Sequence, residues 1–190
     1  NAVFLLFKSN NMQFNIQPLR SKDEITALRS LYEGYLKSIY WSENEMITIL
    51  TGLFKEVRSD EIVNIFQQHL ATKHAHIKSL NAVFESTGIV AEMSAFESIK
   101  CLCKQITATT QNTSRGVVRD AAYIVLVQHI VHSQIASYGT LKAFAITLKE
   151  EEEEIVDVFD VHLMDEKLFD LNLSNIAEAY VNEEAANKEI

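Results

Sequence analysis

The sequence contains very little of the two residue types that interrupt helices. Its 190 residues include one proline, Pro18, and five glycines. Because proline breaks helix interiors and glycine clusters mark turns, this scarcity favours long helices. Hydrophobic residues make up 47% of the chain, enough for one sizeable core, and no proline- or glycine-rich linker divides it. We therefore expect one all-α domain.

Three further absences limit the possible partners and the location. The sequence has no apolar run near the roughly 20 residues that a membrane-spanning helix needs, so no membrane association is expected. The formal net charge is −9 and no segment is dense in Lys and Arg, which argues against nucleic acid. Cys101 and Cys103 lie two positions apart and would diverge on a helix, so a disulfide is not expected. A reducing, cytoplasmic location is therefore expected.

The N-terminal segment "NAVFLLFKSNNMQF" has a short apolar stretch but no features of a signal peptide. No basic segment precedes the stretch and no small-residue cleavage pattern follows it. We expect residues 1–20 to form an extension and residues 21–186 to form the helical domain. The first methionine is Met12, and we hypothesise that residues 1–11 are not native.

Capping signals place the first two long helices. "SKDE", residues 21–24, is a capping box, and apolar residues at helical spacing extend this helix to about residue 53. Ser59 caps a second helix with an acidic first turn, and Gly88 ends it. The apolar line of the first helix is predicted to consist of Leu28, Leu31, Tyr35, Ile39, Met46 and Leu50.

The second half of the chain predicts one short and two long helices. The short helix is expected over residues 91–106, followed by a polar loop, "TATTQNTSRG", over residues 107–116. A third long helix over residues 117–148 is apolar nearly all round. The acidic segment "KEEEEEIVDVF" opens the fourth, which continues to about residue 184. Four long helices and a short one predict an up-and-down bundle.

Several ionisable side chains fall on the inward faces of these helices. Placing residues at about 100° per position turns Glu43 inward on the first helix. On the second helix His69, Lys73 and His76 face inward while His74 faces outward. The inward line of the last helix includes His162, Glu166 and Asp170. These groups are therefore expected to converge near the middle of the bundle.

Two interpretations of this convergence remain open. Buried charges need a partner, a proton or a metal ion. The first interpretation is one Fe, Mn or Zn ion, with the ligands Glu43, His76, Glu166 and Asp170 and the further candidates His69 and His162. The second is a metal-free polar network in which carboxylates and water satisfy the histidines. No catalytic residue and no organic cofactor is indicated.

Residues 118–141, "VRDAAYIVLVQHIVHSQIASYGTL", resemble the YciE/YciF family of ferritin-like proteins. Members carry "RDAA" and "EIASYGTL" at this place. "YWSENEM", "FQQHLATKHAHI", "AEMSAFESI" and "MDEKLFDLNLSNIA" resemble further family motifs, so the similarity covers most of residues 24–180. It implies a ferritin-like four-helix bundle with a short helix in the crossover between the second and third long helices, often dimeric and assigned to metal binding by its fold.

The chain departs from the family pattern at several ligand positions. Glu43, Glu166 and Asp170 stand where the family has carboxylates. Ala71-Thr72, however, replaces two acids of the second helix, and Val131 and Gln134 replace glutamates of the third. Lys73 lies inward, where its ammonium can pair with Glu43 or Glu166 in place of a metal cation.

These departures argue against a complete dinuclear centre. Such a centre carries about four positive charges, which the remaining carboxylates would not balance. We therefore expect a stress-associated or structural bundle that acts by association, with a partly lost metal site and no assigned enzymatic activity. The apolar third long helix predicts a homodimer. The alternative is an Fe-, Mn- or Zn-dependent oxidoreductase or iron-handling protein.

Overall fold

The computed structural model describes residues 22–148 and 153–181, which are helical apart from the connections. The elements are α1 (Lys22–Leu53), α2 (Asp60–Thr87), α3 (Glu97–Asn112), α4 (Val117–Leu148) and α5 (Glu153–Ile176), with a π-helical turn, η1 (Ala177–Val181), after α5. No strand occurs in this described part, so the predicted all-α class is confirmed. The expected N-terminal extension, the Ser21 cap and the acidic start of the last helix at residues 149–152 lie outside it.

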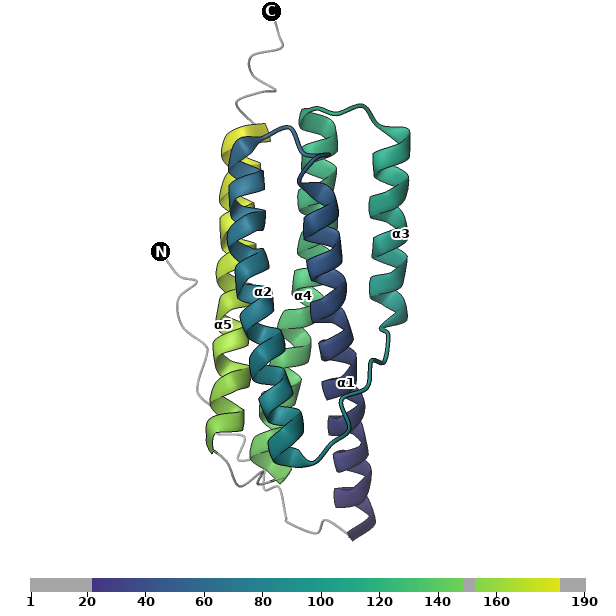
Figure 1. Ribbon diagram of the computed structural model, residues 1–190, viewed down its shortest axis with the longest axis vertical. Helices are drawn as coiled ribbons and strands as arrows, with labels where there is room; N and C mark the ends of the chain where they lie inside the picture. The colour runs from purple at the N-terminus through teal and green to yellow at the C-terminus, as the bar shows by residue number, and fades with distance from the viewer. Residues whose placement is uncertain (1–21, 149–152, 182–190) are drawn as a thin grey trace, which may run out of the picture.

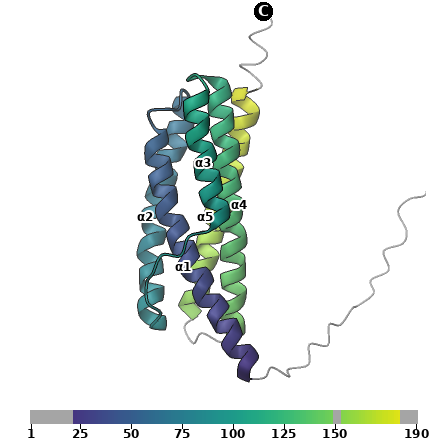
Figure 2. The same cartoon turned by 90° about the vertical axis from the view of Figure 1, so that its right-hand side faces the viewer.

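The four long helices form a bundle with α3 added on one side (Figures 1 and 2). α1 packs against α2 and α4, and α5 packs against the same two helices, so α1 and α5 lie on one diagonal. A long connection along α1 leads from α2 to α3, which packs against α4 (Figure 1). The predicted ferritin-like bundle with a short crossover helix is confirmed.

The boundaries of α2 and α4 agree with the sequence signals. Ser59 Oγ accepts a hydrogen bond from the backbone N–H of Ile62, and Gly88 adopts the left-handed conformation at φ 68° that ends the helix. Burial explains why α4 is apolar nearly all round. It contacts α1, α5 and, along its first half, α3, so little of its circumference there meets solvent.

Two expectations about local structure are wrong. The short helix begins and ends six residues later than predicted, so residues 107–112 are helical rather than a loop. Burial of Ile106 and a 2.6 Å hydrogen bond between Thr110 Oγ1 and Tyr123 Oη hold this polar segment against α4. In α1, Leu31 and Tyr35 are exposed and Tyr32 is buried instead. The inward face there runs through Tyr32, Leu36 and Ile39 in alternating steps of four and three residues.

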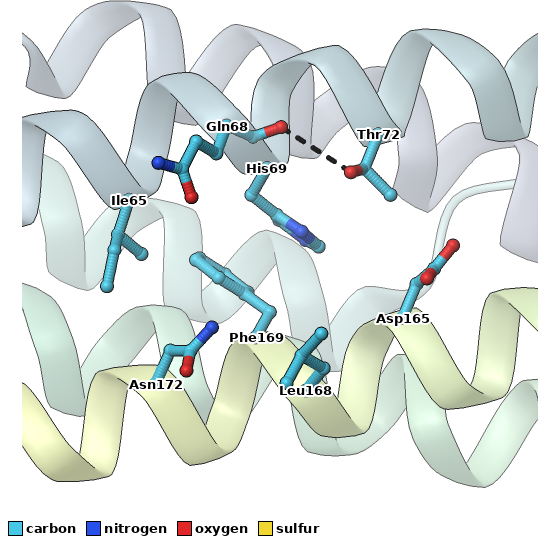
Figure 3. A pocket seen from close by; sticks show the side chains of 8 residues that line it. All are labelled: Ile65, Gln68, His69, Thr72, Asp165, Leu168, Phe169 and Asn172. Atoms are coloured by element: carbon cyan, nitrogen blue, oxygen red, sulfur yellow. Dashed lines mark hydrogen bonds between the residues drawn. The ribbon is translucent and has the colours of Figure 1, made fainter.

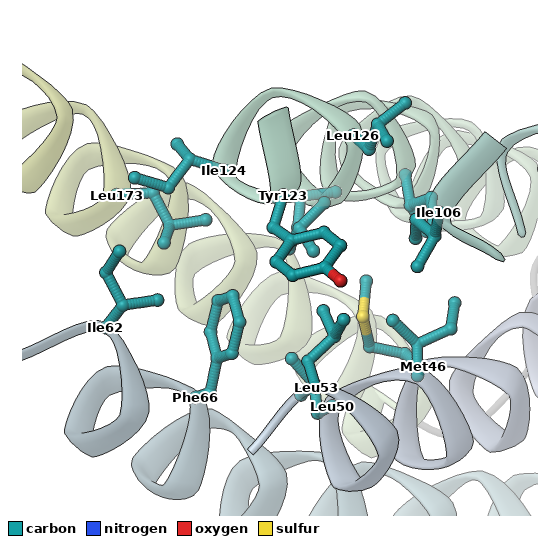
Figure 4. Packing of buried hydrophobic residues seen from close by; sticks show 14 of the residues in the cluster. Met46, Leu50, Leu53, Ile62, Phe66, Ile106, Tyr123, Ile124, Leu126 and Leu173 are labelled. Carbon is teal, nitrogen blue, oxygen red and sulfur yellow. The ribbon is translucent and has the colours of Figure 1, made fainter. Parts of the chain in front are cut away.

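The apolar core is divided into two clusters by a polar layer. Figure 4 shows the first cluster, where Met46, Phe66 and Tyr123 meet near the α1–α2 turn. The second, around Tyr32 and Phe159, fills the other end of the bundle. Glu43 lies in α1 between residues of the two clusters, so the intervening polar layer is at mid-bundle.

The "RDAA" motif joins two turns at one end of the bundle. The Asp120 carboxylate accepts hydrogen bonds from the backbone N–H groups of Arg58, at 3.0 Å, and Ser59, at 2.9 Å. Arg119 donates to a Glu56 carboxylate oxygen at 3.0 Å and to the Thr110 carbonyl at 2.9 Å. The motif therefore fixes the start of α2 and the end of α3 against α4.

Asp120→Ala is expected to lower the free energy of unfolding by about 2–3 kcal/mol, because it leaves backbone N–H groups without their charged acceptor. Urea unfolding followed by circular dichroism measures the change. Asp157→Ala, at an exposed position of α5, is the matched control and should change stability by no more than about 0.5 kcal/mol. Equal effects of the two substitutions would contradict the role of Asp120.

Candidate metal centre

The polar layer at mid-bundle draws one or two side chains from each long helix. All of its central members are at most 2% exposed: Glu43 from α1, Lys73 and His76 from α2, Gln134 and Tyr138 from α4, and Glu166 from α5. Each occupies an inward position of its helix, and their polar groups meet because the helices bring them to the same height. The layer is therefore a buried polar network enclosed by four helices.

Lys73 is the centre of this network. Its Nζ donates hydrogen bonds to Glu43 Oε1 at 2.9 Å, to Gln134 Oε1 at 3.0 Å and to Glu166 Oε1 at 2.5 Å. An ammonium group has three donors, and each is used on a different helix. The expectation that Lys73 pairs with Glu43 or Glu166 is thus confirmed, and it pairs with both.

Glu43 is held by two further partners, both on α4. Tyr138 Oη donates to Glu43 Oε1 at 2.9 Å, and Gln134 Nε2 donates to the same oxygen at 3.3 Å. Gln134 Nε2 also lies 2.9 Å from Ser42 Oγ, which fixes the orientation of the amide. Charge-assisted hydrogen bonds of this kind stabilise a carboxylate away from water. Glu43 is therefore a fixed anion at the centre of the bundle.

His76 links the network to the surface. Its Nδ1 lies 3.3 Å from Glu43 Oε2 and 3.6 Å from Glu166 Oε1, and its Nε2 lies 3.1 Å from Asp165 Oδ2. The Asp165 side chain is 40% exposed, so this contact connects the buried layer with solvent. A carboxylate on one ring nitrogen orients the imidazole and leaves the other nitrogen directed at the two buried glutamates.

His69 and His162 lie at the edges of the layer. The His69 ring stacks on Phe169 with centroids 3.6 Å apart, and its Nε2 is 3.4 Å from Glu166 Oε2. Neither of these two atoms has a well-aligned hydrogen bond within the described residues. His162 stacks on His76 at 3.8 Å, and its Nε2 lies 2.7 Å from Ser79 Oγ. Both rings thus pack at the edges of the layer, His69 next to Glu166 and His162 against His76.

A small hollow between α2 and α5 reaches the network beside His69. It has a volume of about 100 Å³, and Figure 3 shows His69 and Thr72 from α2 facing Asp165 and Leu168 from α5 across it. Water-sized space beside His69 provides a place for a hydrogen-bond partner of its Nε2 atom. The hollow therefore borders the polar layer at His69.

The pKa values show how strongly the charges depend on one another. Burial raises the pKa of Glu43, but the Lys73 ammonium and His76 outweigh burial and hold this pKa well below its usual value. Glu166 has a lowered pKa for the corresponding reason, with Lys73 and His69 opposing burial. Burial lowers the pKa of Lys73, but the two carboxylates outweigh it and raise this pKa. Both glutamates and Lys73 are therefore ionised at neutral pH.

The structure brings together only some of the candidate ligands. Glu43, His76 and Glu166 each offer one ligand atom, and these atoms lie within 4.8 Å of one another. Asp170 does not join them, because its carboxylate turns towards α4 and pairs with His132 Nε2 at 3.0 Å and Gln128 Nε2 at 3.0 Å. Asp170 lies one helical turn beyond Glu166, and its carboxylate is engaged by these two α4 side chains.

Three functional positions were not identified as site residues from the sequence. Asp165 was overlooked because it precedes an inward residue and is half exposed, although the adjacent glutamate marks the level of the site. Gln134 was identified only as the replacement of a family glutamate, and Tyr138 was not assigned to the site. Their polar ends opposite an inward glutamate were the available signal, since buried hydroxyl and amide groups need partners.

The residues present do not fit a metal ion together with Lys73. Glu43, His76 and Glu166 supply the nitrogen and oxygen ligands that Zn, Mn or Fe(II) accept. The Lys73 ammonium, however, already lies between the two carboxylates and is bound by both. A second cation there would face a fixed positive charge in a region of low dielectric constant. In this chain the Lys73 ammonium thus occupies the place between the carboxylates that a metal ion would need.

Four long helices, a crossover helix and inward carboxylates at mid-bundle define a ferritin-like bundle protein. The sequence profile of the family described as "Domain of unknown function (DUF892)" matches residues 27–186, most of the chain. The chain therefore belongs to this family, the YciE/YciF family of ferritin-like proteins, as its motifs predicted.

Comparisons with individual proteins agree. Protein YciF of Escherichia coli (strain K12) is 28% identical over 162 residues, which cover 85% of this chain and 96% of that protein. The crystal structure of the E. coli stress protein YciF is similar with a TM-score of 0.76 at 26% identity, covering 82% of this chain and 97% of the other. YcfI from Rhodopseudomonas palustris gives a TM-score of 0.73 at 25% identity, covering 82% and 98%.

A protein from Xanthomonas campestris shares the fold, with a TM-score of 0.64 at 17% identity, covering 86% of this chain and 99% of the other. Within the described residues, no helix has the length and apolar character needed to cross a membrane.

Proposed function

We propose that this protein is a non-enzymatic, stress-associated bundle that acts in the cytoplasm by association, first of all with a second copy of itself. The observation that carries the proposal is an apolar stripe on the outer face of α5. Its members are more than half exposed: Val161 at 58%, Met164 at 59%, Leu168 at 57% and Leu171 at 56%. The stress association follows the name of the similar E. coli protein.

The spacing of the stripe suits a self-complementary interface. Its members are separated by steps of three, four and three residues, the heptad spacing at which helices pack side by side. In an antiparallel pair of α5 helices, Val161 of one copy would lie level with Leu171 of the other, and Met164 with Leu168. A twofold interface needs such a patch, in which each contact occurs twice.

The feature that supports a homodimer in the structure differs from the one that predicted it in the sequence. The apolar α4 motivated the homodimer at first, but the fold accounts for most of its apolar residues. Tyr123, Ile130 and Val131 are buried within the bundle, and α3 covers part of the outer side. No helix among the described elements covers the apolar stripe of α5 in this way. The expected interface therefore moves from α4 to α5.

Light scattering coupled to size-exclusion chromatography tests the association. We expect the wild-type chain to form a concentration-dependent dimer and Leu168→Asp to weaken it by about tenfold or more, because a charge in the apolar centre of an interface is costly. Ile146→Asp, on α4 at 57% exposure, is the matched control and should leave the dimer intact.

Two results would contradict the proposal. One is a wild-type chain that is monomeric at every concentration studied. The other is an equal effect of Leu168→Asp and Ile146→Asp, since the association would then not depend on α5. Circular dichroism of each variant checks that the helices are retained.

The alternative function, an Fe-, Mn- or Zn-dependent oxidoreductase or iron-handling protein, is supported by the Glu43, His76 and Glu166 cluster. Lys73 argues against it because its ammonium is bound between the two glutamates.

A further inference from the structure

We propose that Lys73 is a built-in cation that keeps divalent metal ions out of the bundle, and that its removal alone would create a metal site from Glu43, His76 and Glu166. The proposal goes beyond association and does not depend on it. It rests on the position of one ammonium group among three side chains that can act as ligands.

The position of Lys73 Nζ is that of a ligated cation. It lies 2.9 Å from Glu43 Oε1 and 2.5 Å from Glu166 Oε1, so one positive charge bridges carboxylates from two helices that lie on a diagonal of the bundle. Gln134 Oε1 is a third oxygen at 3.0 Å. Oxygen atoms from three helices therefore surround a single cation, as they would surround a metal ion.

The ligand set is sufficient without Lys73. The two glutamates and His76 Nδ1 place their ligand atoms within 4.8 Å of one another, a span that one metal ion can bridge. Three protein ligands with a water in the fourth position form a common Zn²⁺ site. The other nitrogen of His76 already contacts Asp165 at 3.1 Å, an arrangement that orients metal-binding imidazoles.

Charge balance makes the lysine and a metal ion mutually exclusive. Two carboxylates and one ammonium give the centre a charge of −1, whereas two carboxylates and a divalent ion are neutral. Both cations together would bring the centre to +1, with two like charges between the same oxygens. Inside the bundle such a contact is strongly unfavourable because water does not screen it. Without the ammonium, the two carboxylates give the centre a charge of −2, and no cation lies between them.

Co²⁺ is a suitable probe because its visible absorption reports its coordination, and it accepts the same nitrogen and oxygen ligands as Zn²⁺. Titration of the wild-type protein, prepared with chelator and then freed of it, is expected to show no stoichiometric binding. Lys73→Ala, which removes the ammonium and leaves room, is expected to bind about one ion per chain with a visible absorption band.

Two further variants identify the ligands. In the Lys73→Ala background, Glu43→Gln is expected to weaken Co²⁺ binding by about 10- to 100-fold, because it removes a charged ligand. His74→Gln in the same background is the matched control, since this exposed histidine on α2 points away from the layer, and its affinity should be unchanged.

The stability of Lys73→Ala gives a second readout that holds even if the variant folds poorly. Co²⁺ should raise its melting temperature, or restore its helical circular dichroism if it is unfolded in chelator, because a metal ion that binds only the folded state stabilises it. Stoichiometric binding by the wild-type chain would overturn the proposal. So would a Lys73→Ala variant that neither binds Co²⁺ nor is stabilised by it.

Discussion

Lys73→Met, studied in the presence of chelator, is expected to lower the free energy of unfolding by about 3–5 kcal/mol at neutral pH. Methionine has a similar length and fills the space of the lysine stem, so the substitution chiefly removes the charge. Glu43 and Glu166 then remain as two buried anions without the cation that both of them contact. Urea unfolding followed by circular dichroism gives the change in free energy.

A triple variant separates the charge from the packing. Lys73→Met combined with Glu43→Gln and Glu166→Gln leaves no unpaired charge, and it is expected to recover much of the lost stability, because neutral groups are cheaper to bury than lone anions. If the single and the triple variants were equally destabilised, the loss would arise from packing and not from the buried anions.

Most of the fold could be predicted because its signals are local. Ser59 and Gly88 mark the ends of α2 through their own backbone and side-chain chemistry, and α4 keeps its predicted bounds. The predictions fail where contacts with residues distant in the sequence determine the local structure. Residues 107–112 read as a loop by composition, yet burial of Ile106 and the hydrogen bond of Thr110 to Tyr123 keep them helical.

The candidate site was predictable in its residues but not in its connections. Helical periodicity turned Glu43, His76 and Glu166 inward, because facing the core is a property of one helix. Which inward groups touch depends on the relative heights of different helices, and the sequence does not contain that information locally. Asp170 was therefore included although it pairs with His132 and Gln128. For the same reason, the contact of Lys73 with both glutamates was left open.

The exposed stripe of α5 shows a related limit. Val161, Met164, Leu168 and Leu171 follow a helical period as regular as that of the buried residues. Periodicity cannot tell which of two apolar faces meets the core, and the apolar composition of α4 favoured that helix as the interface. Only the packed bundle shows which face α2 and α4 cover and which one stays open.

Acid is expected to destabilise the protein from about pH 6.5 downwards, well before the carboxylates titrate. Burial and the neighbouring His76 lower the pKa of His162 to about 3, and burial with the nearby Lys73 lowers that of His69. Each histidine is therefore neutral when folded but takes up a proton on unfolding below its unfolded pKa of about 6.5. Their contribution is present above that pH and is lost as the pH falls towards the folded pKa.

The free energy of unfolding is expected to fall by about 1.4 kcal/mol per pH unit for each proton taken up on unfolding. Glu43 and Glu166 add to the loss below about pH 4.3, their unfolded value, since their folded pKa values are lowered. Lys73 acts at the opposite end, because its raised pKa keeps its contribution until the pH exceeds the unfolded value of about 10.4. Stability should therefore be greatest between about pH 7 and pH 10 as far as these groups determine it.

Urea unfolding at half-unit steps from pH 7.5 to about pH 4 measures this slope. The charged and polar groups around His162 are His76 and Ser79 from α2 and Tyr138 from α4, with Glu43 and Lys73 further inside. His162→Gln keeps a polar group that does not titrate, so it is expected to reduce the slope by about one proton equivalent. His74→Gln, at an exposed position, should leave the slope unchanged. Constant stability from pH 7 to pH 5 would show that the buried rings accept protons in the folded bundle, and that His162 and His69 do not limit its resistance to acid.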